Sequence, residues 1–191
     1  MDKASLLLHI CCAPCGGGCV AALQQEGRRA RLFYSNSNLA DRAEFDKRLE
    51  SVRKLAELYQ LDLEVDPYDH AAWLAAVAGL EKEPEHGKRC SKCFEFSLRR
   101  AALRAAELAE TFATTLTVSP HKNSRQIFDA AKDFAAFEAI DFKKGGNYTA
   151  SCRIARENGF YRQKFCGCEF SRAAVAAFAG KKQQSPNEKL K

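Results

Sequence analysis

Near its start the chain reads SLLLHICCAPC, from Ser5 to Cys15. The apolar run from Ser5 to Ile10 predicts a buried β-strand, because short apolar runs that end at a turn signal are typical of strands covered on both faces. Pro14 suits the first turn of a helix, and the helical pattern that follows extends from about Gly17 to Gly27. A strand that leads straight into a helix is the first unit of an α/β fold.

Downstream of this unit, short β-rich runs alternate with amphipathic helical patterns. The expected strands cover residues 30–35, 61–66, 112–118 and, as a short one, 139–142. The expected helices cover residues 41–59, 71–78, 94–110, 124–138 and 150–157. This alternation predicts a mostly parallel sheet with right-handed helical crossovers, which is a three-layer α/β/α sandwich. In such sheets, sites form beyond the carboxyl ends of the strands.

Length and composition predict one compact domain. The chain has 191 residues, of which 46% are hydrophobic, enough for one substantial core. We expect this domain over residues 1–180 and a disordered basic tail over residues 181–191, where hydrophobicity is low. No apolar run approaches the roughly 20 residues of a membrane span, and no export signal is recognisable, so a cytoplasmic protein without membrane contact is predicted.

The formal charge of +6 favours an anionic partner such as nucleic acid, because lysine and arginine gain affinity by releasing the counterions of phosphate. Charge that serves only solubility is the plain alternative.

Nine cysteines in a reducing compartment indicate metal binding or redox chemistry, since structural disulfides belong mainly to exported proteins. Cys11 and Cys12 stand between the first strand and the first helix, where the helix dipole favours the thiolate that metals bind. Cys90 and Cys93 have a C-x-x-C spacing that lets two sulfurs reach one metal. Together the two pairs offer four thiolates, which suit tetrahedral zinc or a cubane iron–sulfur cluster. Cysteines packed as small apolar residues remain the alternative.

A third pair, Cys166 and Cys168, has a single residue between its members. A disulfide between them would close a small, strained ring, and strained disulfides are the easily reduced, redox-active kind. Gly167 tolerates the distorted backbone that such a ring requires. The pair therefore indicates a dithiol that passes two electrons, with a further pair of metal ligands as the alternative.

The three other cysteines are less informative. Cys15 lies beside Cys12 and could bind a second metal ion or stay free. Cys19 and Cys152 are interpreted as inert buried thiols.

Six blocks of sequence, in order, carry a resemblance to a known family. They are LHICCAPC at 8–15, EFDKRL at 44–49, GKRCSKC at 87–93, TTLTVSPHKN at 114–123, DFKKGG at 141–146 and YRQKFCGCEFS at 161–171. Together these blocks resemble the QueH family of epoxyqueuosine reductases. The resemblance implies a reductase that converts epoxyqueuosine to queuosine at the wobble position of certain tRNAs, the last step in making queuosine.

The resemblance also implies roles for individual residues. By position, the ligands of a 4Fe-4S cluster would be Cys11, Cys12, Cys90 and Cys93. The redox-active pair would be Cys166 and Cys168. The partners implied are a tRNA anticodon loop and an external electron donor.

Removing the epoxide oxygen as water takes two electrons and two protons, so the reaction also needs an acid. His121 and Asp141 both follow predicted strands and are candidate general acids, with phosphate or backbone hydrogen bonding as the alternative role. Basic and aromatic residues that suit an RNA strand with a splayed base lie near the cysteine blocks: Lys122, Arg125, Lys143, Lys144, Tyr148, Tyr161 and Arg162. A solvated charged face is the alternative.

Two other classes of protein are alternatives to the reductase interpretation. A zinc-stabilised nucleic-acid-binding module without catalysis would use the same cysteines. An ATP-dependent tRNA-thiolation enzyme would carry a glycine-rich phosphate loop such as S-G-G-x-D-S after the first strand, but this chain has Cys11–Pro14 there.

Overall fold

A computed structural model describes residues 6–183 of the chain, with side chains as far as residue 179. At its centre is a four-stranded sheet in the order β3-β2-β1-β4. The strands are β1 (Leu6–Ile10), β2 (Ala30–Tyr34), β3 (Leu63–Val65) and β4 (Thr111–Thr114). All three pairs of neighbouring strands are parallel. The first three expected strands are therefore confirmed.

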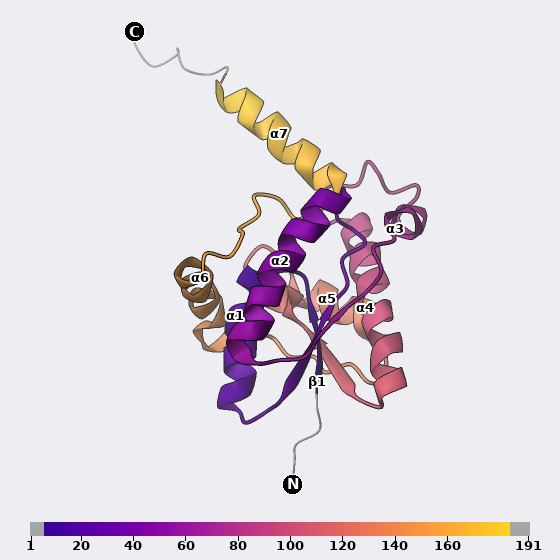
Figure 1. Cartoon of the computed structure of the whole chain (residues 1–191). Coiled ribbons are helices and arrows are strands. Elements are labelled where there is room, and N and C mark those ends of the chain that lie inside the picture. Colours follow the sequence, from indigo (N-terminus) through magenta and orange to yellow (C-terminus); the bar gives the residue numbers. More distant parts are fainter. Residues whose placement is uncertain (1–5, 184–191) are drawn as a thin grey trace.

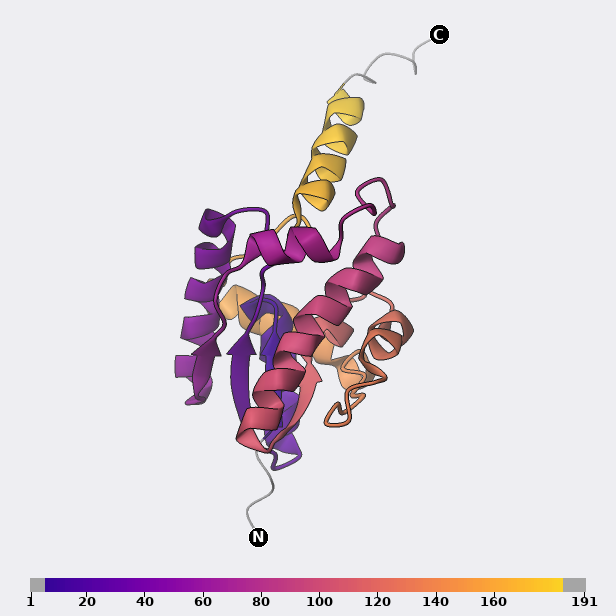
Figure 2. The same ribbon diagram turned by 90° about the vertical axis from the view of Figure 1, so that its right-hand side faces the viewer.

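Helices cover both faces of this sheet. They are α1 (Ala13–Gln25), α2 (Arg42–Tyr59), α3 (His70–Ala76), α4 (Lys88–Leu108), α5 (Ser124–Ala131), α6 (Asn147–Glu157) and α7 (Glu169–Gln183). Two short 3-10 turns, η1 (Thr115–Val118) and η2 (Lys144–Gly146), complete the described elements. α1 and α2 pack on one face with α6 beside α1, and α4 and α5 pack on the other (Figures 1 and 2). The three-layer α/β/α architecture is confirmed.

The central strand β1 is buried along its whole length. Successive side chains of a strand point to opposite faces. Leu6, Leu8 and Ile10 accordingly pack into the core with α1 and α2. Leu7 and Cys11 pack into the second core, with α4 and α5. The unbroken apolar run is thus the consequence of burial on both faces.

α1 begins at Ala13, four residues before the start expected at Gly17, and its glycines lie inside the helix. A Cβ on Gly16 would stand 2.4 Å from Cδ1 of Ile10, and a Cβ on Gly18 would stand 2.1 Å from the backbone oxygen of Asn147 in α6. These glycines therefore permit α1 to approach β1 and α6 closely. Apolar periodicity in the sequence does not predict this close approach.

α4 also begins earlier than expected, at Lys88 instead of Phe94, with Gly87 as its N-cap residue. The sequence KRCSKC lacks apolar periodicity, but lysine and arginine are good helix formers. The helix therefore starts before its buried stripe does. Cys90 and Cys93 consequently lie on the first two turns of α4 and not in a preceding loop.

Only the first half of the strand predicted at 112–118 is a strand, and the second half is the 3-10 turn η1. β4 ends at Thr114, whose hydroxyl accepts a hydrogen bond from the backbone N–H of Leu116 at 3.2 Å and so starts η1. The predicted strand at 139–142 is wrong, because only an isolated bridge between Phe112 and Phe137 forms in this region. The expected helix at 124–138 ends at Ala131.

α7 was not expected, although its alanines favour helix. It projects away from the body of the molecule on the side of the carboxyl ends of the strands (Figure 1). It reaches Gln183 and so overlaps the start of the tail expected from residue 181, and residues 184–191 lie outside the described part. Among residues 6–183, no helix is both long and apolar enough to cross a membrane.

The connections that follow β1 and β4 lead to opposite faces of the sheet, the first to α1 and the second, through η1, to α5. Neighbouring parallel strands whose connections diverge leave a crevice beyond their carboxyl ends, which is the usual site position in open α/β sheets. Cys11 and Cys12 follow β1 directly into this crevice.

Candidate metal and redox site

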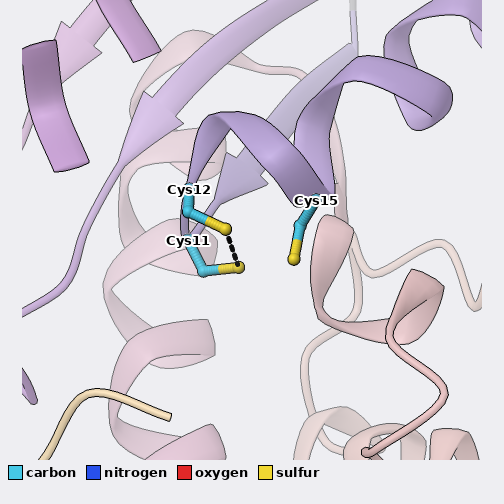
Figure 3. Close-up of side chains that lie close together, drawn as sticks. All are labelled: Cys11, Cys12 and Cys15. Atoms are coloured by element: carbon cyan, nitrogen blue, oxygen red, sulfur yellow. Dashed lines mark hydrogen bonds between the residues drawn. The ribbon is translucent and has the colours of Figure 1, made fainter. Parts of the chain in front are cut away.

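Cys11, Cys12 and Cys15 form a tight group of sulfur atoms beyond the end of β1. Their Sγ atoms all lie within 4.8 Å of one another, and those of Cys11 and Cys12 are 3.9 Å apart. Figure 3 shows the three side chains directed toward a common space. Cys12 is the N-cap residue of α1, with Pro14 in the first turn, so the strand-to-helix turn sets this arrangement.

The three thiols differ in pKa, because they share hydrogen bonds with one another. Hydrogen bonds from Cys11 and Cys15 hold the pKa of the Cys12 thiol well below its usual value. The same shared hydrogen bonds raise the pKa of Cys15 well above its usual value, and burial raises it further. Arg48 lowers the pKa of Cys12 through its positive charge. Of the three thiols, Cys12 is therefore the one whose environment most favours the thiolate, the form that binds metal.

Cys90 and Cys93 lie next to the third cysteine pair. Both line a small cavity together with Cys166 and Cys168, near the N-terminal end of α4. Burial raises the pKa of Cys93, and the nearby charge of Cys166 raises it further. A second small cavity is lined by Cys11, Cys93 and Cys166. The pair on α4 therefore borders both the first and the third cysteine block.

One larger cavity, of about 350 Å³, joins all three blocks. Cys15, Cys90 and Cys166 each line it, one from each block. Stretches that are remote in sequence thus converge on one site beyond the carboxyl edge of the sheet, where the crevice between β1 and β4 was expected to place it.

The loop that carries Cys166 and Cys168 packs against the segment just before α2, which contains Leu39 and Ala40. Both cysteines are free thiols and partly buried. Gly167 has φ +149°, and a Cβ there would stand 2.5 Å from Cδ2 of Leu39, so glycine is required at this position. The backbone oxygen of Gly167 accepts a hydrogen bond from Ala40 N at 3.0 Å. The loop is thereby fixed against the site.

His121 and Lys122 line the larger cavity, as do three further residues with ionisable side chains, Glu85, His86 and Lys164. His121 is exposed at the rim, whereas Lys122 extends inward and also lines the cavity shared by Cys11 and Cys166. Burial opposes the charge of Lys122, but the negative charge of Cys166 and of the first cysteine block outweighs it and raises the pKa of Lys122. Lys122 is therefore an ammonium group facing sulfur.

Asp141, the other candidate acid, is placed differently. Its carboxylate accepts hydrogen bonds from Ser124 Oγ at 2.9 Å and from Lys143 N at 3.3 Å, and it does not line any of the cysteine-lined cavities. Lys143 in turn donates to Ser124 and to the backbone oxygen of Lys122. Both residues hold the loop of Lys122 in place.

The other residues expected to contact RNA fall into two groups. Lys144, Tyr148 and Arg162 are exposed near the start of α6, and Tyr148 is close enough to Arg162 and Cys15 for their charges to affect its pKa. Arg125 pairs with Asp129 at 3.0 Å, and the Tyr161 hydroxyl donates to Glu44 at 3.1 Å. The first group remains available at the surface.

Of the two cysteines interpreted as inert, Cys19 is fully buried, and its thiol donates to the backbone oxygen of Cys15 at 3.2 Å. Burial is only partial for Cys152, which lies on α6 beside Tyr148.

Three residues of the site were not predicted from the sequence. Arg48 donates to the backbone oxygen of Cys166 at 3.0 Å, Gln163 Nε2 donates to Cys12 Sγ at 3.2 Å, and Trp73 borders Cys93 and Cys166 in their cavity. Arg48 and Gln163 lie in the EFDKRL and YRQKFCGCEFS blocks, so block membership was a usable signal for them. Trp73, the only tryptophan in the chain, carried no such signal.

Comparison with known proteins identifies the family. The sequence profile described as "Epoxyqueuosine reductase QueH" matches residues 6–174. A protein of that name from Streptococcus pyogenes serotype M1 is 34% identical over 182 residues, which cover 88% of this chain and 71% of the relative. Its namesake from Thermotoga maritima is 35% identical over 176 residues, which cover 87% of this chain and 90% of the relative.

Among solved structures, a predicted subunit of tRNA methyltransferase from Methanocaldococcus jannaschii aligns with 95% of this chain and 90% of its own, with a TM-score of 0.48 and 12% identity. The profile match spans all three cysteine blocks and most of the chain. This chain therefore belongs to the QueH family of epoxyqueuosine reductases.

Proposed function

We propose that this protein reduces epoxyqueuosine to queuosine in tRNA, in the cytoplasm, with electrons from an external donor. The observation that carries the proposal is the convergence of the three cysteine blocks on one cavity of about 350 Å³. A site with several thiols, an ammonium group and an imidazole can supply electrons and protons together.

We propose Cys11, Cys12, Cys90 and Cys93 as the ligands of a 4Fe-4S cluster. Four thiolates around a single zinc would lie within roughly 4 Å of one another, since each Zn–S bond is about 2.3 Å. Within the described residues, the only group of three or more possible ligands whose atoms lie within 4.8 Å of one another is Cys11, Cys12 and Cys15, and it does not include the α4 pair. Because Cys90 and Cys93 are not gathered that closely with the first block, the proposed ligand set fits a polynuclear centre better than a single zinc. When bound, such a cluster supplies single electrons at low potential.

The proposed redox pair, Cys166 and Cys168, can supply the two electrons and two protons that the reaction consumes. If Cys166 and Cys168 give up two electrons and two protons and become a disulfide, the epoxide accepts them, loses its oxygen as water and leaves an alkene. The external donor then returns the disulfide to the dithiol. The position of Cys166 on the large cavity and on both small ones supports this role, because Cys166 shares these cavities with Cys11, Cys90, Cys93, His121 and Lys122.

His121 is our proposed proton donor to the leaving oxygen, since it lines the cavity where Asp141 does not. Lys122 would stabilise negative charge on that oxygen by donating a hydrogen bond from its ammonium group. Tyr148, with Lys144 and Arg162 beside it, would contact the RNA at the mouth of the site by stacking and by phosphate contacts.

The first test is anaerobic purification followed by iron and sulfide analysis of the full chain. The proposal expects a brown protein with iron and acid-labile sulfide, and near-complete loss of both in Cys12→Ala and Cys90→Ala. Cys152→Ala, on the outer helix α6, is the matched control and should retain both. A colourless protein that holds one zinc per chain would instead support a zinc-stabilised nucleic-acid-binding module.

A further inference from the structure

Three of the four thiols proposed as cluster ligands make a hydrogen bond with a group that can donate, and the fourth, Cys93, lines one cavity with the buried indole N–H of Trp73. The four groups, called here the sulfur-donor set, are Thr115 on Cys11, Gln163 on Cys12, the backbone N–H of His86 on Cys90 and Trp73 near Cys93. They come from four separate segments of the chain, so no local sequence feature explains why every sulfur has one nearby. We infer that the sulfur-donor set fixes the reduction potential of the metal centre. This inference rests on the proposed function.

Gln163 gives the clearest geometry. Its Nε2 donates to Cys12 Sγ at 3.2 Å, while its Oε1 is buried and has no partner within the described part of the chain. The reverse orientation of the amide would set an oxygen acceptor against a thiolate, which is repulsive. The sulfur therefore orients the amide, although one polar atom is left unpaired, at a cost that buried groups normally avoid.

Trp73 repeats the pattern on the opposite side of the site. The ring is fully buried, and its Nε1–H has no hydrogen-bond partner among residues 6–179. Trp73 and Cys93 line the same cavity. We assign the sulfur of Cys93, once it is a metal-bound thiolate, as the acceptor for this unpaired buried donor.

The last two donors are a hydroxyl and a backbone amide. Thr115 Oγ1 is 3.7 Å from Cys11 Sγ, and the hydroxyl must be the donor once that sulfur is a thiolate. The backbone N–H of His86 donates to Cys90 Sγ at 3.2 Å. Three of the four donors are side chains, so they can be removed individually.

Hydrogen bonds to the ligand sulfurs are among the factors that set cluster potentials. Reduction adds negative charge that is shared with the thiolates. A donor therefore stabilises the reduced state more than the oxidised state, and loss of a donor must lower the potential. Because the role inferred for these residues is exerted through the thiolates, they are positioning residues.

The test is an anaerobic redox titration of the full chain, followed by optical absorption, with iron and sulfide measured on each sample. The variants are Gln163→Leu, Trp73→Phe and Thr115→Val. Thr117→Val is the matched control, because Thr117 lies on the same turn but donates to the backbone oxygen of Ile140 at 2.9 Å. With iron content retained, we expect the ratio of reduced to oxidised centre at a fixed potential to fall about tenfold in Gln163→Leu, which is about 59 mV for one electron.

Trp73→Phe and Thr115→Val should shift the potential in the same direction, and Thr117→Val should match the wild type. Unchanged potentials in all variants that retain full iron would overturn the inference and leave the proposed function intact. A wild-type protein without iron and sulfide would instead remove the proposed function, and the inference with it. If one variant fails to bind iron, the other two decide the question.

Discussion

Arg48, buried in α2, donates a hydrogen bond from Nη1 to the backbone oxygen of Cys166 at 3.0 Å and so ties the loop that carries Cys166 and Cys168 to the body of the protein. Its charge is balanced by Glu44 one turn earlier, at 2.7 Å, and Glu44 also accepts from Tyr161. The sheet-packing helix α2 therefore controls where the Cys166–Cys168 pair stands relative to the other cysteines.

Arg48→Met should destabilise the fold by about 3–5 kcal/mol, because it leaves the buried carboxylate of Glu44 without its partner. Urea denaturation of the full chain measures this. Arg42→Met is the control, since Arg42 pairs with Asp46 on the exposed side of α2 and should cost less than about 0.5 kcal/mol. Equal losses in the two variants would show that the buried pair has no special role.

Gly18→Ala should destabilise by about 1–3 kcal/mol, because the new methyl group meets the backbone of Asn147 in α6, which cannot move aside alone. Gly17→Ala is the matched control on the adjacent position. Its methyl group would stand 3.0 Å from Cγ2 of Ile154, a side-chain atom that can shift, so the loss should be smaller. Thermal or urea unfolding of both variants checks the order, and a larger loss for Gly17→Ala would contradict the close packing of α1 on α6.

Cys166→Ser and Cys168→Ser should each retain iron and sulfide and lose turnover by at least about a thousandfold, since either change prevents the dithiol from giving up two electrons. Turnover is measured on tRNA that contains epoxyqueuosine. Cys19→Ser and Cys152→Ser are controls from outside the cavity and should stay active. Full activity in both redox-pair variants would eliminate the dithiol as an electron source.

Asp41 provides a pH-dependent contribution to stability. Hydrogen bonding from the backbone N–H of Glu44 holds the pKa of Asp41 below its usual value, and Arg172 adds to the effect. A carboxyl whose pKa is lower in the folded state stabilises above its unfolded pKa, near 3.9, and loses this contribution as pH falls through the folded value. Asp41→Ala should therefore cost about 1 kcal/mol at pH 7 and progressively less below about pH 4.

Asp41→Asn is the control for this effect, because asparagine caps helices as well as aspartate but does not titrate. Its stability difference from the wild type should be small at pH 7. Urea denaturation at pH 7, 5 and 3 follows both variants. A cost of Asp41→Ala that stays constant across this range would show that the ionised carboxylate is not what stabilises α2.

Local patterns in the sequence were sufficient for the architecture. The apolar run before Ile10 and the alternation of short strands with amphipathic helices predicted parallel strands covered on both faces, because burial on two faces requires such composition. Element ends were predicted less well. α1 starts early because its glycines pack closely, and α4 starts early because lysine and arginine form helix without apolar periodicity. β4 stops at Thr114 because the side chain of this residue caps η1.

The cysteine spacings by themselves determined which sulfurs form local pairs, and the ordered blocks around them indicated the family. Only the tertiary structure decided that Cys15, Cys90 and Cys166 share one cavity, that Lys122 faces it, and that Asp141 does not. Residue spacing limits contacts only within one element. Contacts between remote segments depend on how β1, α4 and the loop after α6 pack around the same sheet edge, and this packing is a property of the whole fold.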